Sequence, residues 1–114
     1  MYIIYHNPRC SKSRQTLDIL KKNELDIEII HYLKNPPSAL EIKSIAKKLS
    51  LTPIEFIRRK EPEFTELGLK DLKNSNEKLY EIMSQNPKLI ERPIVIKGEK
   101  GIIGRPPENV KKLF

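Results

Sequence analysis

The sequence has few of the residues that bind metals or form disulfides. Its 114 residues include one cysteine, two histidines and no tryptophan. A single cysteine forms no disulfide within the chain and supplies no multi-cysteine metal site, and two histidines do not change this. We therefore expect no metal and no bound cofactor. Cys10 is then either a small buried residue or a reactive thiol.

Long apolar runs are also absent. No segment approaches the roughly 18 to 20 consecutive apolar residues that a membrane-spanning helix needs, and residues 1–10 lack the charged and apolar regions of a secretion signal. We expect a cytoplasmic protein that contacts no membrane. The length suits one hydrophobic core, so we predict a single domain over residues 1–114.

The net charge of +7 raises the question of a nucleic-acid partner. The lysines and arginines are spread along the chain, and most alternate with acidic residues, which is typical of solvated helix faces. Aromatic residues make up only 6% of the chain and leave little surface for base stacking. We therefore expect no nucleic-acid partner, although a mild positive field attracts small anions.

The start of the chain shows the pattern of a strand, a helix and a second strand. The apolar run at residues 1–5 ends at Asn7 and Pro8, which favour a turn. Apolar residues at helical spacing predict a helix over 11–23, and 27–32 has the pattern of another strand. So short a crossover favours parallel pairing of the two strands.

The middle of the chain is predicted to be a helical insert over about 36–86. Capping signals begin three expected helices, over about 38–49, 52–60 and 74–83. The signals are Ser38 with Glu41, Thr52 with Pro53 and Glu55, and Asn74 with Glu77. After the insert we expect a hairpin of strands 93–96 and 102–103 and a final helix over 108–114. The whole order predicts an α/β fold.

Cys10 stands directly before the first predicted helix. Unpaired N–H groups and the positive end of the helix dipole at such a position stabilise a thiolate and lower the thiol pKa. Basic residues at 9, 12 and 14 act in the same direction. Ser13 occupies the place of the second sulfur in a Cys-x-x-Cys motif, so any redox cycle requires thiols from outside the chain.

Other candidate site residues are distant from Cys10 or ambiguous. His6 either stabilises the thiolate or is an ordinary polar turn residue. Three arginines could bind a tetrahedral oxyanion through paired hydrogen bonds, although each alone is typical of a surface. They are Arg58, Arg92 and Arg105.

Four segments together carry a more specific signal. YHNPRCSKSR at 5–14, ELGL at 66–69, NPKLIERPIV at 86–95 and GRPP at 104–107 lie in this order along the chain. They closely resemble the glutaredoxin-coupled arsenate reductase family. The resemblance implies a thioredoxin-like fold with a helical insert, in agreement with the predicted order of elements.

The resemblance also implies roles for the candidate residues. Cys10 matches the nucleophile of the family, and His6 matches the residue thought to favour the thiolate. Arg58, Arg92 and Arg105 match the anion-binding arginines, with Arg59 as the alternative to its neighbour Arg58. The family typically has a cis peptide bond at the position of Arg92–Pro93.

The implied activity is reduction of arsenate to arsenite through a thiol-arsenate ester, with glutathione and glutaredoxin as reductants and arsenical resistance as the context. Two alternatives remain open. The first is a related monothiol reductase that acts on glutathionylated or other substrates. The second is a redox regulator of the same fold that binds RNA polymerase, although Ser13 departs from the Cys-x-x-Cys motif usual in such regulators.

Overall fold

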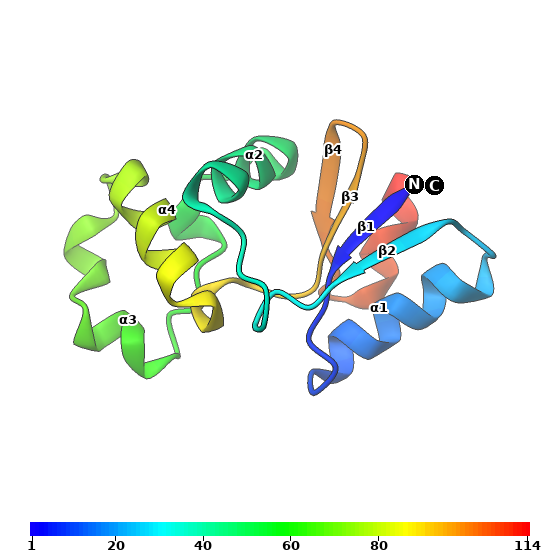
Figure 1. Cartoon of the computed structure of the whole chain (residues 1–114), viewed down its shortest axis with the longest axis horizontal. Coiled ribbons are helices and arrows are strands. Elements are labelled where there is room, and N and C mark those ends of the chain that lie inside the picture. The colour runs from blue at the N-terminus through cyan, green and yellow to red at the C-terminus, as the bar shows by residue number, and fades with distance from the viewer. The chain divides into compact units, whose positions relative to one another are not determined.

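The computed structural model describes residues 1–114, and the chain divides into two compact units (Figure 1). The first unit consists of Met1–Asn35 and Arg92–Phe114, and the second is Pro36–Glu91. The second unit covers the region in which the sequence predicts a helical insert. None of the helices is long and apolar enough to cross a membrane.

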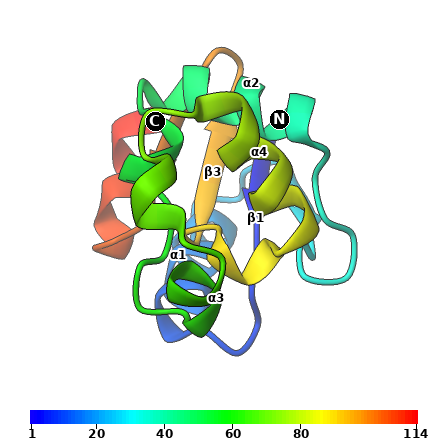
Figure 2. The same cartoon turned by 90° about the vertical axis from the view of Figure 1, so that its left-hand side faces the viewer.

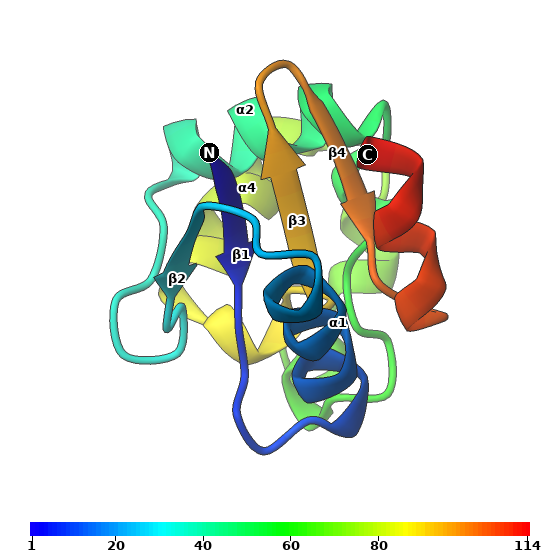
Figure 3. The same ribbon diagram turned by 90° about the vertical axis from the view of Figure 1, so that its right-hand side faces the viewer.

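The first unit contains a mixed sheet of four strands in the order β2-β1-β3-β4 (Figure 3). β1 pairs in parallel with β2 and antiparallel with β3, and β3 and β4 form the predicted hairpin. The α/β class and the parallel pairing are therefore as the sequence predicts. The strands are β1 (Tyr2–Tyr5), β2 (Ile27–Ile30), β3 (Ile94–Lys97) and β4 (Lys100–Ile103).

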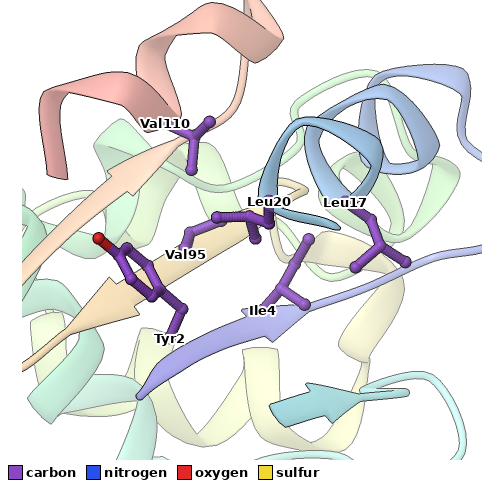
Figure 4. Packing of buried hydrophobic residues seen from close by; sticks show 6 residues of the cluster. All are labelled: Tyr2, Ile4, Leu17, Leu20, Val95 and Val110. Atoms are coloured by element: carbon purple, nitrogen blue, oxygen red, sulfur yellow. The ribbon is translucent and has the colours of Figure 1, made fainter. Parts of the chain in front are cut away.

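One hydrophobic cluster joins this sheet to two helices. Alternate residues of β1 face the helix α1 (Ser11–Lys22), and α1 presents residues three positions apart to the sheet. The 3-10 helix η4 (Pro107–Leu113) adds Val110. Burial of each large apolar side chain contributes roughly 1.5 to 3 kcal/mol. Figure 4 shows the buried members Tyr2, Ile4, Leu17, Leu20, Val95 and Val110.

The second unit is helical, as predicted, and its main helices are α2 (Ala39–Leu49), α3 (Pro62–Glu66) and α4 (Asn76–Gln85) (Figure 2). Three short 3-10 helices accompany them: η1 (Pro53–Glu55), η2 (Leu69–Leu72) and η3 (Pro87–Leu89). The predicted capping box of α2 is present, since Ser38 and Glu41 each accept a hydrogen bond from the other's backbone N–H.

The predicted helix over 52–60 is wrong beyond its first turn. Helical geometry ends at Glu55, because the following backbone groups bond elsewhere in this unit. Ile57 forms a β-bridge with Ile90, and the N–H of Arg58 donates to the carbonyl of Leu89 at 2.7 Å. These contacts between distant residues replace the local hydrogen bonds that would continue a helix.

Other differences from the prediction are smaller, and the strands predicted over 27–32, 93–96 and 102–103 lie at Ile27–Ile30, Ile94–Lys97 and Lys100–Ile103. α4 begins at Asn76 after Ser75, one position later than the capping signal at Asn74 indicates. The final helix is a 3-10 helix over Pro107–Leu113, where the sequence predicts a helix over 108–114. The sequence analysis did not predict α3 or η2, although Pro62 and Gly68, with φ +65°, mark their starts.

Candidate functional site

Cys10 occupies the N-cap position of α1, directly after the turn that follows β1. Its N–H donates to the carbonyl of Asn7 at 3.0 Å and closes that turn. Its carbonyl accepts from the N–H of Arg14 at 3.0 Å, which is the first hydrogen bond of the helix. The side chain is only 8% exposed. The turn and the helix start together hold the sulfur over the unpaired N–H groups of α1.

The hairpin brings two arginines to the same edge of the sheet as Cys10. Ile94 at the start of β3 pairs with both Tyr5 at the end of β1 and Ile103 at the end of β4. Arg92 before β3 and Arg105 after β4 therefore stand beside the loop that leads from β1 to Cys10. Nη1 of Arg105 lies 3.8 Å from Sγ of Cys10 and also donates to the carbonyl of Arg92 at 3.3 Å.

The surroundings lower the pKa of the Cys10 thiol. Burial of the sulfur raises this pKa, but several groups that favour the thiolate outweigh burial. The backbone N–H groups of Ser13 and Lys12 donate to the sulfur, and the charge and side-chain hydrogen bond of Arg92 act in the same direction. The start of the helix thus lowers the thiol pKa, as the sequence analysis expects, and Arg92 lowers it further.

His6 is buried and contacts Ser13. Its Nδ1 lies 2.7 Å from Oγ of Ser13, and the same Oγ accepts from the N–H of Asn7 at 3.0 Å. Burial lowers the pKa of His6, and the neighbouring His31 lowers it further. The lowered pKa favours the neutral imidazole near pH 7, and the side-chain hydrogen bond of His6 is made with Ser13 and not with Cys10.

The sequence analysis names Gly104 only as part of the segment GRPP and gives it no role, yet it lies where three segments meet. A Cβ at this position would stand 2.5 Å from Oγ1 of Thr16 and 2.8 Å from Cγ of Pro93. The N–H of Gly104 donates to the carbonyl of Pro93 at 2.9 Å. Only glycine permits this approach, which holds the segment leading into Arg105 against both α1 and the start of β3. In the sequence, this close approach is marked only by a glycine directly before Arg105.

Two peptide bonds in the first unit are cis. One is Arg92–Pro93, as the resemblance implies. The other is Arg105–Pro106, which the sequence analysis did not predict.

Arg58 belongs to the second unit. Its guanidinium forms an ion pair with Glu61 and lies 4.0 Å from Glu91. The neighbouring Arg59 is exposed and lines a cavity of about 460 Å³ together with Lys70. The two adjacent arginines therefore have different surroundings within this unit. No group of three or more His, Cys, Asp and Glu residues in the chain is placed to hold a metal ion.

The chain is similar to known proteins along nearly its whole length. The model of the ArsC family matches residues 5–113. The uncharacterized protein YfgD of Escherichia coli is 47% identical over 96% of this chain and 93% of its own length. An arsenate reductase of Haemophilus influenzae is 45% identical over 98% and 97%. The solved structure of an arsenate reductase from Vibrio cholerae superposes with a TM-score of 0.94 at 41% identity, over 99% and 97% of the two chains. The predicted thioredoxin-like fold is thereby confirmed.

Proposed function

Because the chain belongs to the ArsC family, we propose that it is a cytoplasmic thiol oxidoreductase that reduces arsenate to arsenite. One observation carries the proposal: Nη1 of Arg105 lies 3.8 Å from Sγ of Cys10 at the start of α1. A thiolate alone repels an anion, whereas a thiolate beside a guanidinium can receive one. The chemistry of the pair therefore fits an oxyanion that is attacked by sulfur.

In the first step the Cys10 thiolate attacks arsenic, a sulfur–arsenic bond forms and one arsenate oxygen leaves as water after protonation. The lowered pKa of Cys10 increases the fraction of the nucleophilic thiolate near neutral pH. Arg92 and Arg105 offset the negative charge of the ester and orient the oxyanion for attack. Arg58 is the proposed third ligand, as the resemblance implies.

His6 supports the nucleophile in this scheme as a positioning residue. It holds the hydroxyl of Ser13, and the backbone N–H of Ser13 faces the sulfur of Cys10. The same Ser13 supplies no second thiol, so the two electrons that reduce arsenic come from outside the chain.

Glutathione supplies the next thiol. Its sulfur displaces a second arsenic oxygen as water, which leaves arsenic bound to both Cys10 and glutathione. A glutaredoxin thiolate then attacks the glutathione sulfur, takes up the glutathione as a mixed disulfide and leaves both electrons on arsenic as As(III). Water hydrolyses the remaining sulfur–arsenic bond, which releases arsenite and regenerates Cys10.

A coupled assay tests the proposal. Arsenate, glutathione, glutaredoxin and the purified protein are combined with glutathione reductase, and oxidation of NADPH is followed. We expect a rate that depends on all four components and saturates with arsenate. No arsenate-dependent rate at any glutaredoxin concentration would contradict the proposal.

One observation favours a second candidate, a monothiol reductase of glutathionylated substrates. The charge of Arg58 is already shared with Glu61 and Glu91, so fewer unopposed cations are available for a doubly charged oxyanion. A glutathione mixed disulfide needs only the thiolate of Cys10 and weaker anion contacts. The same coupled assay, with a glutathione mixed disulfide in place of arsenate, separates the candidates by their kcat/KM values.

A further inference from the structure

The proposed reaction needs an external thiol to arrive beside Cys10, and the first unit has a cavity beside the loop that leads to this residue. The cavity has a volume of about 280 Å³. Four consecutive residues of the loop, 6–9, form one wall, and the segment after β2 forms the other. Arg9, which immediately precedes Cys10, belongs to the first wall.

The topology explains why the two walls meet. β1 and β2 are parallel neighbours, so the segments that follow them leave the sheet at the same edge. His6 follows β1 and His31 follows β2, and their ring centroids are 5.9 Å apart. The carboxyl ends of parallel strands are where α/β proteins bind ligands most often. The cavity thus has a fixed place next to the nucleophile.

The lining of the cavity is basic and contains no carboxylate. Arg9, His31 and Lys34 supply the positive or protonatable groups, and all three are exposed. None of them belongs to an ion pair of this structure. Pro8 and Leu33 add apolar surface, and the Leu33 side chain is 39% exposed. The pattern suits a ligand that combines carboxylate groups with short apolar segments.

We propose that this cavity binds the carboxylates of the reducing thiol, glutathione. Glutathione is a tripeptide with two carboxylates and one ammonium group, so its net negative charge matches the lining. A volume of about 280 Å³ admits part of such a molecule and leaves its thiol free to reach the adduct on Cys10. The redox role of this site rests on the proposed function, but the binding itself does not.

Binding is tested with S-methylglutathione, which keeps both carboxylates and has no free thiol. Amide NMR spectra of the protein are recorded during a titration. We expect saturable shifts in residues 7, 9 and 31–34, and an increase of about tenfold or more in Kd for Lys34→Ala, because a charge-assisted hydrogen bond is lost. Lys47→Ala, an exposed lysine of α2, is the matched control and should leave Kd unchanged. Shifts confined to other residues, or equal Kd values for the Lys34 and Lys47 variants, would overturn the proposal.

Kinetics then connect the site to turnover. In the arsenate assay Lys34→Ala should raise the KM for glutathione about tenfold or more, and the loss of rate should disappear at saturating glutathione. An unchanged KM for glutathione would overturn the proposal, and so would a loss that depends only on glutaredoxin concentration, since the cavity would then contact the partner protein. Shifts at the cavity without arsenate reduction under any condition would support this binding site and contradict the proposed function alone.

Discussion

Arg105 and Cys10 are 95 residues apart in the sequence, yet Nη1 of Arg105 lies 3.8 Å from Sγ of Cys10. Two strand pairings produce this approach, because β3 pairs with both β1 and β4 and gathers their ends at one edge. A thiol at a helix start and a guanidinium at the end of a hairpin therefore lie side by side.

The first prediction concerns the acidity of Cys10. Backbone N–H groups and Arg92 hold its pKa below the usual value, so the rate of alkylation by iodoacetamide should rise with pH and level off below the free-thiol value of about 8.5. Arg92→Ala should move this inflection to higher pH, since the thiolate loses a cation. An inflection at or above the free-thiol value in the unmodified protein would mean that Cys10 is a structural residue.

The second prediction concerns oxyanion binding. Arg105→Ala should weaken the inhibition of alkylation by arsenate or phosphate about 10- to 150-fold, because a charge-assisted contact worth roughly 1.5 to 3 kcal/mol is lost. Arg105→Lys should recover only part of the affinity, since lysine restores the charge without the two parallel donors. Protection by arsenate is measured as the concentration that halves the alkylation rate.

Two adjacent arginines provide the control for this prediction. Arg58→Ala should weaken protection in the same way if Arg58 is the third ligand, whereas Arg59→Ala should have little effect. If arsenate protected Cys10 from alkylation equally well in the parent and in the Arg105, Arg92 and Arg58 variants, the arginines would bind no oxyanion. A reductase of glutathionylated substrates would then be the better interpretation.

The third prediction concerns Gly104. An added Cβ would stand 2.5 Å from Oγ1 of Thr16, so Gly104→Ala should lower the free energy of unfolding by about 1 to 3 kcal/mol. Urea titrations measure the change. Thr16→Ala in the same chain removes Oγ1 and should recover part of the loss, although Pro93 still crowds the site at 2.8 Å. If the changes in the free energy of unfolding caused by the two substitutions simply added, the added Cβ and Oγ1 of Thr16 would not clash.

The fourth prediction concerns pH and His6. Burial lowers the pKa of His6 in the folded protein, so the unfolded chain binds this proton more strongly. The contribution of neutral His6 to the free energy of unfolding is complete above the pKa of the unfolded chain, about 6.5. It is lost as the pH falls from there through the lower pKa of the folded protein. Urea midpoints at pH 7.5 and 5.5 should therefore differ more in the parent than in His6→Gln. The control His31→Gln should keep most of the difference in midpoint that the parent shows between the two pH values. If His6→Gln kept the whole difference, the pH dependence would not come from burial of His6.

Local signals explain which parts of the fold the sequence could predict. The strand, turn and helix around Cys10 depend on the spacing of apolar residues and on Asn7 and Pro8, all within a short stretch. The capping box at Ser38 is local in the same sense. The helix expected over 52–60 is wrong because Ile57 pairs with Ile90, and no local pattern reports a contact between residues so far apart.

The site, too, has features that local sequence determines and features that depend on contacts between distant residues. The thiol and its helix start are local features, so their chemistry could be derived from the residues alone. The approach of Arg92 and Arg105 to Cys10 depends on the register of three strands, which spacing does not determine. Their residue type makes them candidate anion ligands, and only the family resemblance implies that they belong to one site. The contact of His6 with Ser13 could not be predicted either, because the short sequence separation of His6 and Cys10 suggests a direct contact between those two residues.

The fifth prediction tests the central claim, that the Cys10 thiolate attacks arsenate. Arsenite formation is measured with saturating glutathione and glutaredoxin for the parent and for Cys10→Ser, while arsenate binding is followed by isothermal titration. A serine hydroxyl is scarcely ionised near pH 7 but keeps the shape of the loop, so we expect Cys10→Ser to bind arsenate and to form no arsenite above background. Arsenite formation by Cys10→Ser at a rate similar to that of the parent would contradict the account.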